Sequence, residues 1–599
     1  MADLRRTRSG NSARSRSRSR SSQTSNPPLH RLLSSQFPDD VSVYHQEDGE
    51  GVYVDEDAAS IHQSETERRM TQSDGFSFSE TESAEKAEPE RIHTLTGEDT
   101  IEETAEDTTA EQDIEARAVA LEKTKSARST RDPNLITWEG DDDPKNPKNW
   151  SFRRKWAACL IVSCFTFVSP VSSSIISPAL PNISEEFGIT DEVQGQLTLS
   201  IFVLAYAIGP LFLGPLSEIY GRVLVLQLSN LFYLAWNLGC GFAQSSGQLM
   251  AFRFMSGLGG SAPLAIGGGM LSDLFHAEQR GKAISIYSLA PLLGPAIGPI
   301  AGGYIVAGTT WRWCFWSTSI FCAVVQCFGY FLLQETYAPK LLAWKRDELR
   351  KETGNAALHT EHDSAEKTLV NTLRIALKRP FVLLFTQPIV QVLACYMAYI
   401  YGLMYLILST FPVLWTTRYH QSSGTGALNF IAMGLGFFIG SQTCAPLMDR
   451  IYSRLKRRNN GVGKPEFRVP MMVPGSFLVP IGLFWYGWSA QTTAHWILPD
   501  IGAVVFCTGS IVGFQCIQTY IVDAYTRYAA SAIAAATVLR SLAGFAFPLF
   551  APYMYQKLDY GWGNSLLGFV SLALGIPAPI LLWKYGAVLR AKSKFAAGG

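Results

Sequence analysis

Long apolar blocks recur along this chain from about residue 150 almost to its end. Each block has the roughly 20 apolar residues that an α-helix needs to cross a bilayer. They form two sets of six, separated by a polar connector. The expected spans lie near 156–180, 195–216, 223–243, 250–274, 283–307 and 313–333, and near 381–411, 426–448, 469–489, 496–522, 529–553 and 564–587.

This pattern predicts an all-α membrane protein with twelve transmembrane helices in two six-helix halves, an arrangement typical of transporters built from related repeats. A short echo supports the duplication, because Glu218 and Asp449 close the second span of each half, and Asp273 and Asp523 close the fourth. The expected divisions are an N-terminal half at 151–333, a central cytoplasmic loop at 334–380, a C-terminal half at 381–590 and a short tail at 591–599.

Residues 1–150 differ in composition from the rest of the chain. Arg and Ser alternate over 5–21, and residues 47–124 are rich in Glu, Asp, Ser and Thr with few bulky apolar side chains. Such a mixture buries too little surface to offset chain entropy, so a long disordered tail is expected. Dense Arg also attracts phosphates, which makes RNA binding an alternative. The run contains no aromatic residue, and a phosphorylatable cytoplasmic tail without a nucleic-acid partner is favoured.

Lys and Arg are distributed unevenly among the connectors. They gather before the first span and in every second connector, most densely at 450–468. The connector at 181–194 has four acids and no base. By the positive-inside rule, both termini are expected in the cytoplasm. Asn182 then lies on the outer side, in an Asn-Ile-Ser pattern that could accept a glycan.

Several classes of function find no support in the sequence. The ten cysteines form no CxxC pair and the nine histidines are scattered, so neither a metal site nor a disulfide framework is expected. No nucleophile or cofactor constellation indicates an enzyme. The phosphate-binding pattern GxxxxGK[ST] is missing from the sequence, which argues against ATP as the direct energy source.

A doubled glycine repeat marks the fifth span. Gly294, Gly298 and Gly302 recur every four residues and are followed by Gly303. On a helix they form a smooth stripe that lets a neighbouring helix approach closely. Pro295 and Pro299 lie beside this stripe, and such prolines are tolerated where neighbouring helices satisfy the freed carbonyls. The stripe is expected to help form the seam between the halves; simple packing is the alternative.

Charged residues at span ends and inside spans are the candidates for gating and coupling. Glu218 and Arg222 are four residues apart, close enough to pair on a helix. Arg253 and Arg540 lie inside spans, where an arginine needs a partner, protein or water; Arg253 could instead snorkel to the interface. Carboxylates are scarce at depth. The candidates for coupling are therefore Arg253, Asp273, Asp500 and Arg540, and those for gating are Gly214, Glu218, Gly221, Arg222 and Asp449.

Neutral polar and aromatic side chains gather in the seventh and tenth spans. A broad, mostly uncharged cavity lined by such groups suits amphipathic organic molecules better than sugars or phosphates. Ordinary helix packing is the alternative for any single tyrosine. The candidates are Gln387, Gln391, Tyr396, Tyr399, Gln515 and Gln518, with Tyr401 and Tyr405 on the same span as the tyrosines just named.

Three of these stretches resemble motifs of the twelve-span drug:proton antiporters of the major facilitator superfamily. LAPLLGPAIGPIAGGYI at 289–305 resembles their fifth-helix antiporter motif. Leu249, Arg253, Gly257 and Gly259 match the fourth-span motif, with Ser256 where Gln is usual. GPLSEIYGR at 214–222 is similar to the loop G-x-L-x-D-R-x-G-R, with Glu218 for the aspartate and Ile219 for the first arginine.

Further stretches look like fungal members of that group, namely NPKNWSFRRKW, ETYAPKLL and YGWSAQTTAHW. The resemblance implies a role of Arg253 in proton coupling and a cytoplasmic gate at 214–222. It also implies a proton-coupled exporter of lipophilic drugs, toxins or secondary metabolites, working as a monomer in the plasma membrane or in a vacuolar or other internal membrane. The alternatives are a dedicated exporter of one endogenous metabolite or polyamine, and a nutrient importer or sensor.

Overall fold

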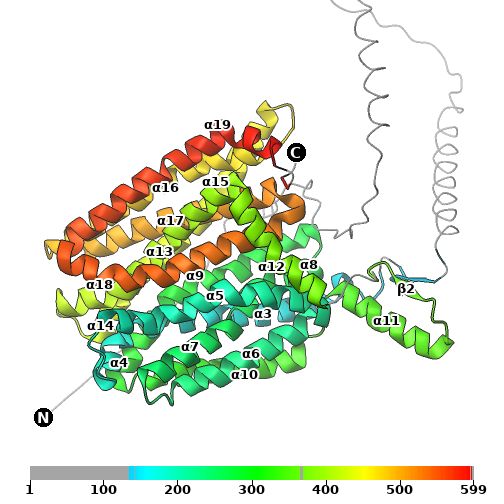
Figure 1. Ribbon diagram of the computed structural model, residues 1–599, viewed down its shortest axis with the longest axis horizontal. Coiled ribbons are helices and arrows are strands. Elements are labelled where there is room, and N and C mark those ends of the chain that lie inside the picture. The colour runs from blue at the N-terminus through cyan, green and yellow to red at the C-terminus, as the bar shows by residue number, and fades with distance from the viewer. Residues whose placement is uncertain (1–131, 133, 141, 364–368, 594, 597–599) are drawn as a thin grey trace, which may run out of the picture. The chain divides into compact units, whose positions relative to one another are not determined.

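The computed structural model describes residues 132–596 apart from 133, 141, 364–368 and 594, so residues 1–131 of the tail expected at 1–150 lie outside the described residues. Two compact units make up the described chain, a helical bundle and a smaller unit formed by the described residues up to 143 and those of 339–363. The bundle contains both sets of expected spans, cyan to green for the first and yellow to red for the second (Figure 1).

The first half of the bundle supplies six spans. The first span follows a short 3-10 helix η2 (Pro147–Asn149), and the fourth is interrupted at Ser261, where Pro263 opens a new helix. The elements are α3 (Phe152–Ser174), η3 (Ser177–Ala179), α4 (Leu180–Glu186), α5 (Glu192–Tyr220), α6 (Arg222–Cys240), α7 (Ser246–Gly260), α8 (Ala262–Leu274), α9 (Ala277–Gly308) and α10 (Arg312–Leu332).

The second half repeats this arrangement. Its eighth span has a short first helix that ends at Leu428, and a 3-10 helix leads into the ninth. The elements are α13 (Pro388–Thr417), α14 (Ser423–Leu428), α15 (Phe430–Arg458), η4 (Pro465–Met471), α16 (Met472–Gln491), α17 (Ile497–Ala524), η5 (Thr526–Tyr528), α18 (Ala529–Gly575) and α19 (Pro577–Ala591).

The described residues contain eleven continuous apolar segments long enough to cross a membrane. They account for twelve spans because the last segment is divided in two. The last segment, Ala529–Ala591, has 63 residues. At 1.5 Å per residue it would be about 95 Å long, three times the hydrocarbon thickness of a bilayer. The backbone leaves helical geometry at Asp559 (φ 53°, ψ −176°), which divides α18 into the eleventh span and the start of the twelfth. The predicted architecture is confirmed.

The seventh span begins at Pro388, seven residues later than 381, the start expected from hydropathy. Residues 381–386 belong to a separate helix, α12 (Leu369–Thr386). Gln387 between them is extended (φ −107°, ψ 106°). Pro388 has no N–H to donate, which suits the first position of a helix and not its interior. Apolar residues therefore continue across a real helix boundary that the hydropathy pattern could not show.

The smaller unit contains part of the stretch that was expected to be disordered. Strand β1 (Leu135–Ile136) pairs in parallel with β2 (His359–Thr360), and α11 (Ala338–Thr353) precedes β2. Although burial acts to raise it, hydrogen bonds from Arg346 and from the Thr360 amide lower the pKa of Asp363. Residues 135–136 of the expected tail therefore form a strand, because β1 finds its partner more than 200 residues away, a contact that local composition cannot reveal.

The helix ends define two ends of the bundle. We call the end that carries Arg222 and the 459–464 connector the basic end, and the end that carries the 187–191 connector the acidic end. In Figure 1, α8 and α12 mark the basic end on the right, and α4 and α14 mark the acidic end on the left. The halves meet where α5 packs against α18, α9 against α15, and η3 against α13.

The outer faces of the helices are apolar. Leu224, Leu228 and Leu231 of α6 and Phe328 and Phe331 of α10 are each at least 45% exposed. A soluble protein rarely presents so much contiguous apolar surface, whereas hydrocarbon accommodates it without cost. The exposed leucines and phenylalanines are thus the lipid-facing counterpart of the polar residues inside the bundle.

The glycine stripe of α9 packs within its own half. Added Cβ atoms at Gly294, Gly298 and Gly302 would collide with Pro170, Ser174 and the Ile175 carbonyl of α3. The expectation that this stripe forms the seam between the halves is therefore wrong. A different face of α9 reaches the second half. A Cβ at Gly303 would lie 2.7 Å from the Ser423 carbonyl, and one at Gly434 would lie 2.8 Å from Ala296.

Gly302→Ala should destabilise the bundle, because the new methyl group would meet the Ile175 carbonyl oxygen in a backbone contact that cannot easily yield. Overpacking of this kind typically costs about 1–3 kcal/mol. Gly268→Ala is the matched control, since nothing lies within 4 Å of its Cβ position and loss of backbone freedom in the unfolded chain favours alanine. Thermal unfolding midpoints in detergent test the pair. A midpoint of Gly302→Ala at or above that of Gly268→Ala would contradict close packing of α3 on α9.

Candidate functional site

Arg253 is completely buried at the centre of the first half, with 0% of the residue exposed. Its guanidinium donates to four backbone carbonyls at 2.9–3.3 Å, those of Ser172, Ser173, Thr198 and Leu199. Ser172 and Ser173 end α3, where carbonyls have no helical partner. Arg253 therefore ties α7 to α3 and α5 and does not snorkel to the interface.

The same end of α3 contacts the second half. The Ser173 hydroxyl lies 3.1 Å from the Tyr405 hydroxyl of α13, and Ser177 donates to the Leu408 carbonyl at 2.7 Å. Ser172 also pairs with Tyr233 of α6. Arg253 thus holds the backbone of Ser173, one of the two serines that join the halves.

Nearer the acidic end, the start of α5 meets the end of the eleventh span. Tyr553 donates to Asp191 at 3.4 Å, and the Gln556 amide donates to Glu192 at 2.5 Å. Gly303 also approaches Ser423 between the halves. Among the described residues, these contacts between the halves lie from the bundle centre to the acidic end.

Arg222 organises the basic end of the first half. Its side chain lies 3.4 Å from Asp273 and 3.7 Å from Glu218, and it donates to Ser217 at 2.8 Å. All of these partners belong to the first half. Glu218 is 40% exposed, so its pairing is weak, whereas Asp273 is 21% exposed. Gly214, the first glycine of this loop, has open space around its Cβ position.

Arg468 plays the corresponding part in the second half, although sequence reasoning did not single it out. It lies in η4, is 5% exposed, and pairs with Asp449 at 2.8 Å and Asp523 at 2.9 Å. The echo of Glu218 with Asp449 and of Asp273 with Asp523 now has a physical reason. In each half, carboxylates that end the second and fourth span hold an arginine that precedes or opens the third.

A further contact fastens the last span of each half to the third, with the charges reversed. Glu335, after α10, accepts the N–H groups of Arg222 at 3.0 Å and Val223 at 3.2 Å. Gly221 makes room for it, since a Cβ there would strike the carboxylate and the backbone has φ 108°. In the second half Arg590 of α19 donates to Glu466 at 2.9 Å. The ETYAPKLL stretch contains Glu335, but no spacing rule in that stretch indicated its role.

The two remaining candidates for coupling lack ionic partners in the described residues. Asp500 is 6% exposed in the first turn of α17, and its Oδ1 accepts no hydrogen bond. The pKa of Tyr419, which lies beyond the end of α13, is raised mainly by burial and also by the nearby Asp500 carboxylate. Arg540 of α18 is half-buried with an unpaired Nε, and its guanidinium lies over the rings of Tyr401 and Phe514.

The structure separates the candidates for the cavity. Tyr396 pairs with Ser476 at 3.2 Å, and Tyr399 donates to the Leu567 carbonyl at 2.5 Å, so both face their own half. Gln387 and Gln391 lie at the junction of α12 and α13, where they bond to Thr386 and the Phe385 carbonyl. Gln515 donates to Ser441 while its Oε1 stays unpaired, and Gln518 is half-buried. Tyr401 and Tyr405 are the tyrosines of α13 that approach the first half.

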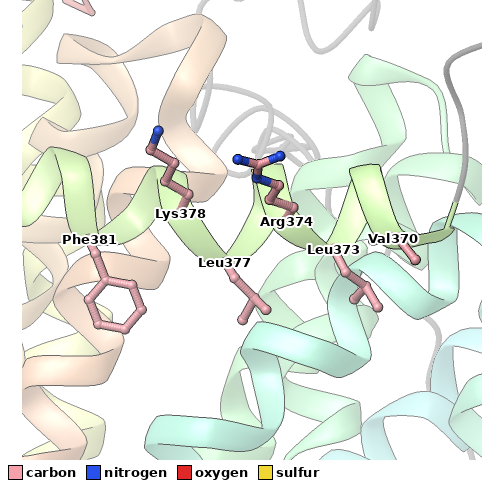
Figure 2. A pocket seen from close by; sticks show the side chains of 6 residues that line it. All are labelled: Val370, Leu373, Arg374, Leu377, Lys378 and Phe381. Carbon is pink, nitrogen blue, oxygen red and sulfur yellow. The ribbon is translucent and has the colours of Figure 1, made fainter.

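Helix α12 adds an amphipathic element at the basic end. It contacts α5 of the first half and α13 and α18 of the second. In Figure 2, Leu373, Leu377 and Phe381 point to one side of this helix, and Arg374 and Lys378 to the other. These side chains and Val370 line an open groove of about 680 Å³. Its apolar side offers a surface for lipophilic molecules or lipid tails.

Two further predictions concern other chemistry. Asn182 is exposed in α4, and its glycosylation stays a prediction. In the part of the chain that the structure describes, no group of three or more His, Cys, Asp or Glu side chains could hold a metal ion.

Comparison with known proteins identifies the family. Residues 162–548 match the family model of the Major Facilitator Superfamily. The chain is 54% identical over 489 residues to the efflux pump vrtL of Penicillium aethiopicum, covering 81% of this chain and 96% of that pump. It is 43% identical over 478 residues to the MFS-type transporter oryF of Aspergillus oryzae, covering 79% and 98% of the two chains.

A solved structure has the same fold. The partially occluded, inward-open structure of the xylose transporter XylE from E. coli matches 72% of this chain and 98% of XylE, with a TM-score of 0.53 and 17% sequence identity. At that identity the likeness concerns architecture alone. The family match, the fungal relatives and the twelve-span fold agree, and this chain belongs to the major facilitator superfamily as a multi-pass membrane transporter.

Proposed function

We propose that this protein exports lipophilic, aromatic small molecules by alternating access, driven by inward movement of protons. The observation that carries the mechanism is the division of contacts between the two halves. Serine, tyrosine and glycine contacts join the halves from the centre to the acidic end, while the ion pairs of Arg222 and Arg468 each stay within one half. Similarity to a relative named an efflux pump supports export as the direction.

The ion pairs at the basic end are proposed to brace each half. Arg468 holds the ends of α15 and α17 to η4, and Arg222 holds α8 to the start of α6. Helices fixed at their ends move together, which allows one half to rock against the other as a rigid body. The residues Gly214, Glu218, Gly221, Arg222 and Asp449 then serve gating by keeping each half intact rather than by bridging the halves.

Asp500 is the better candidate for the proton carrier. Asp273 already has Arg222 as a cationic partner, whereas Asp500 is buried with an unpaired oxygen. An isolated buried carboxylate is costly as an anion, and taking up a proton removes that cost. Its position near the acidic end fits proton entry from outside, if that end faces out as the positive-inside rule predicts.

The charges near the seam bear on the cargo. Arg253 and Arg540 place positive charge near the centre of the bundle, and the described acidic residues of the spans lie toward helix ends. This arrangement disfavours polyamines and favours neutral or acidic aromatic molecules. One endogenous metabolite of that kind would satisfy the site as well as a range of toxicants. We propose the plasma membrane as the location, cytoplasmic termini, and the monomer as the working unit.

Purified protein in liposomes tests the proposal directly. With an imposed pH gradient, vesicles should accumulate a neutral lipophilic dye against its gradient when the protein's basic end faces the bath, and a protonophore should abolish this accumulation. A panel of unrelated aromatic compounds would distinguish a generalist from a dedicated exporter. Facilitated movement in the opposite direction, with the pH gradient driving uptake from the acidic end, would instead establish an importer.

Asp500→Asn should separate proton coupling from substrate movement. We expect gradient-driven accumulation to fall at least tenfold, while exchange of labelled for unlabelled cargo at equal pH continues at a rate within about twofold of the original protein. Glu185→Gln is the control, because this acid is exposed at the same end of the bundle. Unchanged accumulation in Asp500→Asn would remove Asp500 as the carrier.

Arg468→Met should weaken the second half. The change leaves Asp449 and Asp523 without their cation in a mostly buried position, and breaking such a pair typically costs about 3–5 kcal/mol. Glu218→Gln removes an ion pair of 3.7 Å whose acid is 40% exposed, so a loss of about 0–1 kcal/mol is expected. Unfolding midpoints in detergent compare the two variants. Equal midpoints would show that Arg468 does not brace the half.

A further inference from the structure

Arg540 differs from the other arginines of the bundle interior. Arg222 and Arg468 pair with carboxylates, and Arg253 donates to four carbonyls. Within the described residues, Arg540 makes no ion pair, and its Nε is buried without a hydrogen-bond acceptor. A cation held inside a membrane bundle without a partner is costly and marks a site where charge serves a function.

Two aromatic rings frame the Arg540 guanidinium. Its Cζ lies 5.0 Å from the ring centre of Tyr401 and 5.1 Å from that of Phe514. Gly544, one turn along α18, gives Tyr401 its place, because a Cβ there would lie 2.9 Å from the ring. Neither ring contact is a hydrogen bond to an oxygen or nitrogen acceptor, so the guanidinium N–H donors remain available to an acceptor that the cargo brings.

The cluster of Arg540, Tyr401 and Phe514 lies near the middle of the bundle and close to the seam. Arg540 is eleven residues from the start of α18, about 17 Å along the helix. Tyr401 has its ring 5.0 Å from that of Tyr405, whose hydroxyl meets Ser173 of the first half. A Cβ at Gly544 would also lie 3.2 Å from Val203 of α5. Helices of both halves therefore converge beside the free cation.

We propose that Arg540, Tyr401 and Phe514 form a subsite for aromatic organic acids, with the anionic oxygens of the cargo on the guanidinium and its flat ring system beside the two aromatic side chains. Arginine presents parallel N–H donors that match a carboxylate. This inference rests on the proposed transport of aromatic molecules and names the class of cargo that binds best. The cargo supplies the counter-ion that the protein lacks, so the site distinguishes acids from neutral molecules of equal size.

Binding of 1-naphthoate and 1-naphthamide to the purified full chain tests the subsite, because the two probes share a ring system and differ in charge. Equilibrium dialysis in detergent should show at least tenfold tighter binding of naphthoate. Arg540→Gln should remove this preference and leave naphthamide affinity within about threefold. Arg540→Lys should keep part of it, since charge remains while the planar fork is lost. Arg418→Gln is the control and should keep the preference, because Arg418 pairs with Asp559 at the acidic end.

The outcomes are decisive in each direction. Equal affinities for the two probes in the original protein, or a preference that survives Arg540→Gln, would overturn the subsite. If Arg540→Gln failed to fold, as judged by size-exclusion chromatography and circular dichroism, the probe ratios of the original protein and of Arg540→Lys would still decide. Transport of a neutral dye in liposomes is measured separately. Its failure would count against the proposed export function, whereas loss of acid preference alone counts against this subsite.

Discussion

The end of α3 is the constraint on which the centre of this bundle depends. A helix that stops inside a membrane protein leaves carbonyls without partners, and lipid offers no water to satisfy them. Arg253 supplies the missing donors to Ser172 and Ser173 and reaches α5 with the same guanidinium. Because its donors are hydrogen-bonded to backbone, Arg253 fixes Ser173, whose hydroxyl meets Tyr405 of the other half. Arg253 therefore links the packing at the centre of the first half to a contact between the halves.

Duplication explains the basic end, and divergence between the copies is equally informative. Both halves use carboxylates at the ends of their second and fourth spans to hold one arginine. Each half also fastens its last span to its third through a charged side chain, but the charges are opposite. Glu335 accepts backbone N–H groups in the first half, and Arg590 donates to Glu466 in the second. The two halves share the geometry of these contacts although the residues differ, and the loop with Ile219 in place of the first arginine still forms a cluster around Arg222.

The sequence predicted the spans, the burial of Arg253 and the matching acids at the span ends of the two halves, because polar groups are costly in hydrocarbon and gather where the spans end. It did not predict which faces of the helices meet. Helix α13 is apolar on nearly every side, so its period cannot tell Tyr399, which bonds to Leu567, from Tyr405, which bonds across the seam. The glycine stripe is ambiguous in the same way. Small residues indicate that some helix packs closely on α9, but they do not indicate which helix. Arg468 was not distinguishable in a basic connector whose other Lys and Arg residues are exposed or half-buried.

Comparison of the two central arginines extends this argument to specificity. Arg253 and Arg540 have the same chemistry, yet backbone carbonyls occupy the first and aromatic faces the second. A guanidinium whose N–H donors are hydrogen-bonded within the protein stabilises the surrounding structure, whereas one with free donors can bind an acceptor on a ligand. Aromatic faces hold the second guanidinium without competing for its N–H groups. In the rocking mechanism proposed above, Arg253 would keep one half rigid, and Arg540 at the seam would gain its partner only when cargo is bound.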